Sequence, residues 1–285
     1  MTTILDGKKL RDKKITLLKE ELLKINNKLG LVVIQVGEDE ASKVYVRQKE
    51  KLAKNLGYYF KHKKFASNIS NEELISYVNY LNNLDNVDGI IVQMPLPKHI
   101  DASLIQNSIS PYKDVDGLTE INHGKLVHNE NTIFPCTPKG IIDLLDEYNV
   151  PITGSNVVII GRSILVGKPL SLMLTNKDAT VTLLHSKSKN IEYYTKNADI
   201  LIAAIGKKHF IKEDMVKDNS TIIDVGINRE NGKLYGDVDY DNVYSKVDFI
   251  TPVPGGVGPM TVYELMNNVY IAHNLRKKVL KKWYH

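Results

Sequence analysis

The chain has 285 residues, of which 42% are hydrophobic and 25% are charged, and its formal net charge is +5. This composition is typical of a soluble globular protein long enough for two modest domains, and its scattered lysines give little support for nucleic-acid binding. The single cysteine, Cys136, excludes an intrachain disulfide and fits a reducing compartment. Because the N-terminus lacks the apolar core of a signal peptide and no transmembrane run appears, we expect a cytoplasmic protein without a membrane partner.

The first half of the sequence alternates helical and strand patterns. Ser70-Asn-Glu-Glu73, for example, is a capping box that predicts the start of a helix. The predicted elements are a helix over 8–28, a strand over 31–36, a helix capped by Ser42 and ending near Asn55, a strand over 58–63, a helix over 70–84, a buried strand over 88–97 that ends in prolines, and a short helix over 101–108. This alternation predicts one α/β domain.

The stretch from Asn156 to Pro169 predicts a nucleotide-binding turn. Val157 to Ile160 is an apolar β-branched run, as in a strand buried on both faces of a parallel sheet. Gly161 allows a tight turn, and Gly167 allows a helix to start close to the sheet. The N–H groups at that helix start would face a phosphate. The alternative is a plain structural joint between a strand and a helix.

The rest of the second half continues the alternation. A helix is predicted over 138–148 and another over 168–174, followed by strands over 180–184, 200–203 and 221–224. A strand at Phe249 then enters a loop rich in glycine and proline, and Thr261 is expected to cap a last helix that ends near Lys278. These elements predict a second α/β unit of the size of a dinucleotide-binding domain.

Several polar residues stand where α/β proteins place their sites. Tyr45 and Lys49 are four residues apart on a predicted helix and therefore share one face, although most helical lysines simply lie in solvent. Gln93 follows a buried strand at its carboxyl end, and Asp114 and Asp116 flank a turn closed by a glycine.

Seven motifs in order give the chain a resemblance over nearly its whole length. They are Ser42-x-x-Tyr-Val46 with Lys49, Val92-Gln-Met-Pro-Leu-Pro97, Lys113-Asp-Val-Asp-Gly117, Pro135-Cys-Thr-Pro138, Gly161-Arg-Ser-x-x-Val-Gly167, Asp224-Val-Gly-Ile-Asn228 and Thr251-Pro-Val-Pro-Gly-Gly-Val-Gly-Pro-Met-Thr261. With them the chain resembles the bifunctional methylenetetrahydrofolate dehydrogenase/methenyltetrahydrofolate cyclohydrolase family. The resemblance implies oxidation of 5,10-methylenetetrahydrofolate and hydrolysis of the methenyl product to 10-formyltetrahydrofolate, within one-carbon metabolism and purine biosynthesis.

The resemblance also implies roles for residues on the folate side. Lys49 would transfer protons, with Gln93 and Tyr45 orienting it, and Tyr45 would also stack on the folate ring. Asp116 would accept hydrogen bonds from the pterin N–H groups. A substrate-binding role extends to Pro254, Gly255 and Gly256, and Asp114 and Gly117 would support the site. For each of the supporting residues a purely structural role is equally open.

On the cofactor side, the resemblance places Gly161, Arg162 and Ser163 at the dinucleotide phosphates and ribose. The strand over 180–184 ends in His-Ser-Lys-Ser-Lys, without the acid that NAD enzymes use to bind the ribose 2′-OH. This ending favours a 2′-phosphate and hence NADP, with Arg162 and Ser186 as its clamp. Ile227 is expected near the nicotinamide.

The predicted architecture is α/β, with two α/β domains around a cleft. Residues 1–138 with 262–285 would form the folate-binding catalytic domain, and residues 139–261 a Rossmann-like NADP-binding domain. A homodimer is expected from the family. No histidine or cysteine cluster has metal-ligand spacing, and His123 is expected to be a surface or packing residue and not a catalyst. Three alternatives stay open: a dehydrogenase that lacks the second activity, a two-domain dehydrogenase for a shikimate-like or amino-acid substrate, and a non-enzymatic nucleotide-binding module.

Overall fold

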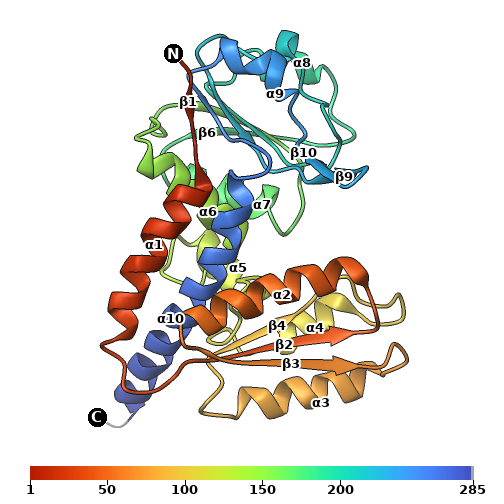
Figure 1. Ribbon diagram of the computed structural model, residues 1–285, viewed down its shortest axis with the longest axis vertical. Coiled ribbons are helices and arrows are strands. Elements are labelled where there is room, and N and C mark those ends of the chain that lie inside the picture. Colours follow the sequence, from red (N-terminus) through yellow and green to blue (C-terminus); the bar gives the residue numbers. More distant parts are fainter. Residues whose placement is uncertain (284–285) are drawn as a thin grey trace. The chain divides into compact units, whose positions relative to one another are not determined.

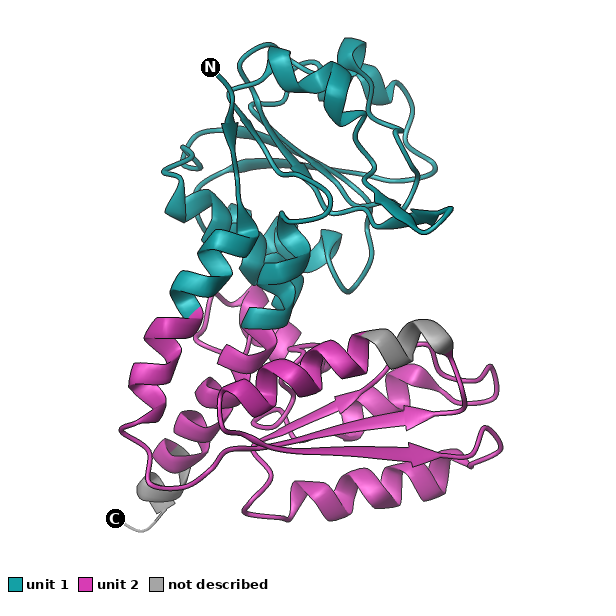
Figure 2. Ribbon diagram, viewed as in Figure 1, with its two compact units in different colours: residues 1–14, 135–263 teal, residues 15–134, 264–285 magenta. Residues whose placement is uncertain are grey.

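A computed structural model describes the backbone of residues 1–283 and the side chains of residues 1–39 and 45–278. The chain forms two compact units (Figure 2). Unit 1 comprises residues 1–14 and 135–263, and unit 2 comprises residues 15–134 and 264–285. Two helices, α1 (Gly7–Leu22) and α10 (Val257–Trp283), contribute residues to both units.

Unit 2 contains a three-stranded parallel sheet in the order β3-β2-β4 (Figure 1). Its elements are β2 (Gly30–Val36), α2 (Glu40–Asn55), β3 (Tyr59–Phe65), α3 (Asn71–Asn82), β4 (Gly89–Val92), α4 (Ala102–Ser108) and α5 (Glu120–Val127). Alternate residues of β2 share one face of the sheet, so Val32 and Ile34 enter a core with Leu74 and Val78 of α3. β3 is one of the two edge strands and is rich in lysine, which protects an exposed edge from pairing with another chain.

Unit 1 is built on a six-stranded parallel sheet in the order β1-β11-β8-β7-β5-β6. Its strands are β1 (Thr3–Ile4), β5 (Asn156–Ile160), β6 (Thr180–Leu184), β7 (Ile200–Ala203), β8 (Thr221–Asp224) and β11 (Phe249–Ile250). Its helices include α6 (Cys136–Glu147), α7 (Gly167–Thr175), α8 (Ile191–Thr195) and α9 (Tyr240–Val243), with η1 (Glu213–Met215) and η2 (Tyr244–Lys246) as short 3-10 turns. The strand order reverses at β5, which is where doubly wound sheets bind ligands.

The first strand of the chain belongs to unit 1. Thr3 N–H donates to Asp248 O at 2.7 Å and Leu5 N–H to Ile250 O at 2.9 Å, so β1 extends the sheet beside β11. Residues 1–14 therefore group with unit 1, whereas the sequence prediction places them with residues up to 138. The assignment of folate binding and NADP binding to the two predicted ranges stays a prediction.

Local signals predicted some element boundaries well and others poorly. The capping box is confirmed, because Ser70 Oγ accepts from Glu73 N–H at 3.1 Å and Glu73 Oε2 accepts from Ser70 N–H at 3.0 Å. The first helix ends at Leu22, six residues before its predicted end, and α2 begins at Glu40. The side chain of its expected cap, Ser42, lies outside the described residues.

Three features of the fold differ from the prediction or were not predicted. Thr261 is not a cap, because α10 begins four residues earlier at Val257; its Oγ1 lies 3.0 Å from Thr137 Oγ1 of α6. The helix starts early because Pro259 fits the first turn, where no intrahelical N–H bond is lost. Neither α5 nor the antiparallel hairpin of β9 (Asn228–Glu230) and β10 (Lys233–Tyr235) was predicted.

Candidate functional site

The carboxyl end of β4 brings Gln93 to Lys49 in unit 2. Gln93 N–H donates to Ile34 O at 2.8 Å, which extends the sheet pairing one residue beyond the strand. Its side-chain Nε2 donates to Met94 O at 2.8 Å, and this bond turns Oε1 toward α2. Lys49 Nζ then donates to Gln93 Oε1 at 3.0 Å. The sheet thus fixes the amide, and the amide fixes the ammonium group.

Tyr45 lies one turn before Lys49 on α2. It is 44% exposed, so its ring is accessible to a ligand. The spacing of four residues places Tyr45 and Lys49 on the same side of the helix, as the sequence predicts. An exposed phenol ring one helical turn from Lys49 is suited to stacking against a flat heteroaromatic ligand.

Asp116 completes the polar group in unit 2. Its side chain is half-buried but densely surrounded by protein atoms. Burial raises the pKa of the Asp116 carboxyl, the positive charge of Lys49 lowers it, and the negative charge of Asp114 raises it further. The charge of Lys49 therefore acts on Asp116, and the structure brings together Lys49, Gln93 and Asp116, which are far apart in sequence, with Tyr45 one turn before Lys49 on α2.

Asp114 is a structural residue of the turn that carries Asp116. Its fully buried carboxylate accepts from Gln106 Nε2 at 3.0 Å, from Thr119 N–H at 2.8 Å and from Asn122 Nδ2 at 2.8 Å. The turn is joined to the sheet by Ile90 N–H, which donates to Lys113 O at 2.8 Å. These bonds engage both oxygens of the Asp114 carboxylate and stabilise the turn that carries Asp116.

Lys113, in the same motif, also has a structural role. Its buried Nζ donates to Leu81 O at 3.0 Å and Leu84 O at 2.7 Å, just past the end of α3. Burial, with a contribution from nearby Arg276, lowers the pKa of Lys113 to about 8. His123, predicted to be a surface or packing residue, is half-buried on α5, and burial lowers its pKa.

The glycine–proline loop lies in unit 1. Gly255 O accepts from Lys8 N–H at 3.0 Å, and Gly256 N–H donates to Pro252 O at 2.8 Å. A Cβ on Gly256 would lie 2.7 Å from Pro252 O, so the turn itself requires glycine there. Pro254 follows a cis peptide bond and is exposed. These contacts explain the loop structurally, and its predicted contact with substrate stays a prediction.

The turn after β5 has the form that a dinucleotide phosphate requires. Gly161 has φ +122°, and a Cβ there would lie 2.3 Å from Ala204 O. A Cβ on Gly167 would lie 1.7 Å from Gly161 O, so the first residue of α7 touches the turn directly. Ser163 Oγ accepts from Val166 N–H at 3.1 Å and shapes the loop between them. Because Lys168 N–H donates to Ser163 O at 3.1 Å and Pro169 has no N–H, Gly167 is the residue of the first turn of α7 whose N–H a phosphate would meet.

Charged and polar side chains surround this turn. Arg162 and Ser163 are exposed, as is Ser186 in the loop after β6. That loop is folded by His185, whose N–H donates to Ser188 Oγ at 2.9 Å and whose Nδ1 accepts from Lys187 N–H at 3.2 Å. Because β5 and β6 are parallel neighbours, their following loops lie at the same edge of the sheet.

Two buried acids behind this edge were not singled out in the sequence analysis. Asp224 ends β8 and accepts from the N–H groups of Gly226, Asp237 and Val238 at 3.1, 2.9 and 2.9 Å. Burial raises the pKa of Asp224 to about 7, and the charge of Asp237 adds to the increase. Ile227, the predicted nicotinamide neighbour, lies beside them and is 48% exposed. The sequence gives little indication of these two acids, because each accepts hydrogen bonds from backbone N–H groups, and backbone groups leave no pattern of residue types.

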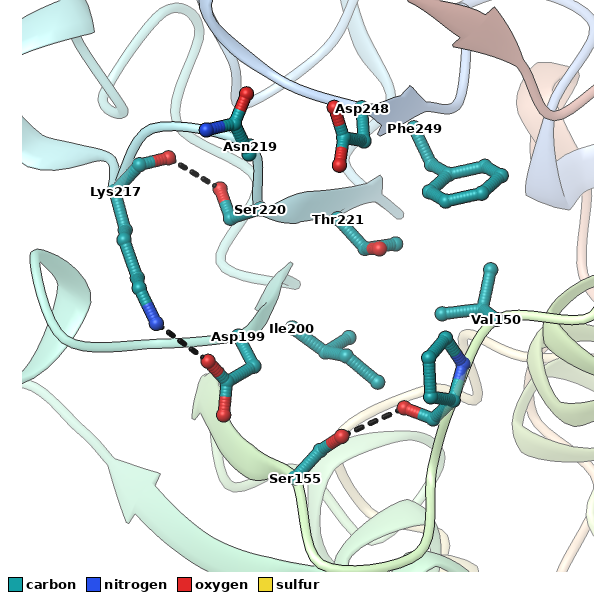
Figure 3. Close-up of a pocket in the computed structure, with 11 residues that line it drawn as sticks. Val150, Ser155, Asp199, Ile200, Lys217, Asn219, Ser220, Thr221, Asp248 and Phe249 are labelled. Atoms are coloured by element: carbon teal, nitrogen blue, oxygen red, sulfur yellow. Dashed lines mark hydrogen bonds and ion pairs between the residues drawn. The ribbon is translucent and has the colours of Figure 1, made fainter.

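A surface cavity of about 270 Å³ lies elsewhere in unit 1, at the amino ends of the strands (Figure 3). Its walls include Asp199, Lys217 and Phe249, and Lys217 Nζ donates to Asp199 at 2.6 Å. None of the predicted site residues lines it. In doubly wound sheets ligands bind at the carboxyl ends of the strands, so this cavity is not the candidate site.

The described residues contain neither a metal-binding cluster nor a membrane-spanning helix. Within residues 1–39 and 45–278, no group of three or more His, Cys, Asp or Glu side chains is placed to hold a metal ion. No helix in the described part of the chain has the length and apolar character needed to cross a membrane.

Comparison with known proteins identifies both halves of the chain. Residues 5–116 match the family model for the tetrahydrofolate dehydrogenase/cyclohydrolase catalytic domain, and residues 135–277 match the model for the NAD(P)-binding domain of the same family. The chain belongs to the tetrahydrofolate dehydrogenase/cyclohydrolase family. The resemblance stated from the motifs is thereby confirmed.

Individual members of the tetrahydrofolate dehydrogenase/cyclohydrolase family agree along the whole chain. The bifunctional protein FolD of Campylobacter concisus is 48% identical over 94% of this chain and 96% of its own length. The crystal structure of Campylobacter jejuni FolD covers 97% of this chain and all of its own, with 43% identity and a TM-score of 0.95. The FolD of Trypanosoma brucei, solved with NADP and an inhibitor, covers 96% and 98% with 33% identity and a TM-score of 0.91. These matches confirm the predicted α/β fold class with its NAD(P)-binding domain.

Proposed function

We propose that this protein oxidises 5,10-methylenetetrahydrofolate with NADP and hydrolyses the 5,10-methenyl product to 10-formyltetrahydrofolate. The observation that carries the proposal is the bond from Lys49 Nζ to Gln93 Oε1 at 3.0 Å, with Asp116 close by, in a chain that matches both domain models of the family. The group combines a proton carrier, a residue that orients it and an acceptor for ligand N–H groups.

Substrate recognition is assigned to Asp116 and Tyr45. The pterin ring carries adjacent N–H donors, and a carboxylate with two oxygens accepts two such bonds at once. Since burial raises the pKa of Asp116, ligand donors and the charge of Lys49 both stabilise the ionised form that binding needs. The exposed ring of Tyr45 offers a flat surface on which the ligand stacks.

The oxidation step requires position more than acid–base chemistry. Loss of hydride from the bridging carbon leaves a cation that the two adjoining nitrogens stabilise, so no side chain has to take up a proton. NADP, when bound, supplies the hydride acceptor. The contribution of the chain is to hold the folate carbon at a fixed place with Asp116 and Tyr45, and to hold the dinucleotide at the turn after β5.

The hydrolytic step uses Lys49. Water adds to the methenyl carbon and loses a proton, N5 gains a proton as its bond to that carbon breaks, and the remaining hydroxyl loses a second proton as the formyl C=O forms. The sum is methenyl cation plus water giving 10-formyl product and one proton. Lys49 carries the proton between these positions, a role suited to an amine beside a carboxyl group. Gln93 directs the amine by accepting one of its N–H bonds.

The dinucleotide fits the carboxyl edge of the sheet in unit 1. A Cβ on Gly161 or Gly167 would meet neighbouring backbone atoms, so both glycines are needed for the turn, and the N–H of Gly167 lies at the start of α7, where we place a phosphate. The loop after β6 has no acid between residues 185 and 189, so nothing there repels a 2′-phosphate. Arg162 and Ser186 are exposed and supply donors for it. The T. brucei relative binds NADP, which supports the preference.

A spectrophotometric assay tests the function. Purified protein is given methylenetetrahydrofolate with NADP or NAD in parallel, and reduced cofactor and the methenyl intermediate are followed at separate wavelengths. We expect reduction, stronger with NADP, without accumulation of methenyl product. Accumulated methenyl product would indicate a dehydrogenase without the second activity. Absence of reduction with either cofactor would overturn the proposal, and equal efficiency with NAD would overturn the assignment of Arg162 and Ser186.

We also propose that the protein is a cytoplasmic homodimer, as its family resemblance suggests. Analytical ultracentrifugation at micromolar concentration, together with cell fractionation, tests both statements. A monomeric mass or a membrane-bound or exported pool would contradict them.

A further inference from the structure

The carboxylate of Asp237 accepts hydrogen bonds from three successive backbone N–H groups, those of residues 205–207. Asp237 is 0% exposed and follows the β9–β10 hairpin. Its Oδ2 accepts from Ile205 N–H at 2.7 Å and Gly206 N–H at 3.0 Å, and its Oδ1 accepts from Lys207 N–H at 2.7 Å. Successive N–H groups that converge in this way form an anion-binding nest, and here the anion is a side chain of the protein itself.

The same carboxylate also holds the loop after β8. Asn228 Nδ2 donates to Asp237 Oδ1 at 3.1 Å, and a Cβ on Gly226 would lie 2.1 Å from that oxygen. Asp237 therefore fills the space directly behind Gly226 and Ile227. Asp224 fixes Asp237 in turn, because its Oδ1 accepts the Asp237 backbone N–H at 2.9 Å.

The loop that Asp237 holds lies against the phosphate turn. Ala204, which precedes Ile205, places its carbonyl oxygen where a Cβ on Gly161 would come within 2.3 Å. A displacement of residues 205–207 therefore changes the space available at Gly161. One carboxylate thus fixes the loops after β7 and β8, and through the first of them it borders the turn after β5.

We propose that Asp237 is a positioning residue for the dinucleotide, which holds the loops after β7 and β8 in the shape that the cofactor needs. The proposal rests on the proposed function. The N–H groups of residues 205–207 are occupied by Asp237, so these groups are not available to the cofactor phosphates, which are left to the turn after β5. The Asp237 carboxylate itself does not touch the reacting atoms.

The test compares Asp237→Asn with wild type. The amide keeps the size of the side chain but replaces one acceptor oxygen with a donor that faces N–H groups. We expect the dissociation constant for NADP, measured by calorimetry, and the KM for NADP to rise about tenfold to hundredfold, the range for loss of charge-assisted hydrogen bonds. The KM for folate and the hydrolysis of directly supplied methenyltetrahydrofolate, which uses no cofactor, should stay within about twofold of wild type.

Asp199→Asn is the matched control. Asp199 also accepts a backbone N–H, from Asn156 at 2.8 Å, but it lies just before β7, at the amino ends of the strands, away from their carboxyl ends where the cofactor is placed (Figure 3). The Asp199→Asn substitution should lower the free energy of unfolding without changing the affinity for NADP. Unchanged NADP affinity in folded Asp237→Asn, or equal losses in both variants, would overturn the proposal.

If Asp237→Asn does not fold, the milder variant Asn228→Ala provides a second test of the proposal. Asn228→Ala removes one of the four donors to Asp237 and leaves the three backbone bonds, and we expect NADP affinity to fall about threefold, near 0.6 kcal/mol. Unchanged affinity there would overturn the positioning role. Calorimetry with NADP alone separates this outcome from failure of the proposed function, which only the turnover assay reports.

Discussion

Gly161→Ala tests the phosphate turn most directly. The substitution adds one methyl group at a residue with φ +122°, a conformation that side chains rarely adopt. The new Cβ would lie 2.3 Å from Ala204 O and 3.0 Å from Ala204 C. Since these are backbone atoms of the loop that Asp237 holds, no side-chain rotation relieves the contact.

The magnitude follows from two contributions. An unfavourable backbone conformation costs about 1 to 3 kcal/mol, and forcing an extra methyl group into packed surroundings costs about another 1 to 3 kcal/mol. We therefore expect a loss of about 2 to 6 kcal/mol in the free energy of unfolding, a large part of the roughly 5 to 15 kcal/mol that stabilises a typical domain. Movement of the turn should also weaken NADP binding by at least about tenfold.

Urea denaturation and NADP calorimetry measure the two effects, with Gly154→Ala as the control. Gly154 has φ +76°, but a Cβ there meets nothing within 4 Å. That variant isolates the backbone cost of about 1 to 2 kcal/mol, and it should leave NADP affinity unchanged. If both variants lose the same stability and Gly161→Ala binds NADP like wild type, the contact with Ala204 has no role in shaping the turn.

Three further predictions concern single side chains. Lys49→Met should lower cyclohydrolysis by about a hundredfold or more while retaining more of the hydride transfer; equal retention of both activities in the coupled assay would remove Lys49 from proton transfer. Asp116→Ala should weaken folate binding about tenfold to a hundredfold with NADP affinity intact, and unchanged folate affinity in calorimetry would refute its role. Because burial raises the pKa of Asp224 to about 7, folding favours its protonated form, and that stabilisation is complete below about pH 4 and lost as pH rises through 7. The stability of wild type relative to Asp224→Asn should therefore fall by on the order of 3 kcal/mol between pH 5 and pH 8, and a flat difference in urea denaturation would contradict this.

The parts of the fold that the sequence predicted depend on local signals. The capping box at Ser70 and Glu73, the β-branched run of β5 and the glycines at 161 and 167 each act over a few residues, so their patterns are visible in the sequence. The pairing of β1 with β11 joins segments about 245 residues apart, and nothing within Thr3–Ile4 indicates that partner.

The candidate site shows the same division. Lys49 and Gln93 could be named because motifs of a known family contain them, and the distance of 3.0 Å between their side chains is something that only the fold supplies. Asp237 had no such signal. Its role arises from backbone N–H groups of residues 205–207, and backbone groups are alike in every sequence.

The pairing of β1 with β11 has a consequence for the order in which the protein is made. A ribosome adds about 5 to 20 residues per second, so roughly 12 to 50 s separate the emergence of Thr3 from that of Phe249. Unit 2 is also incomplete until α10 has been made, because Asn268 of α10 donates to Val115 O and Phe134 O, each at 2.9 Å. In the nascent chain, β1 therefore lacks its partner β11 and unit 2 lacks α10 until the last helix has emerged. A chaperone that binds exposed chain segments would act during this interval.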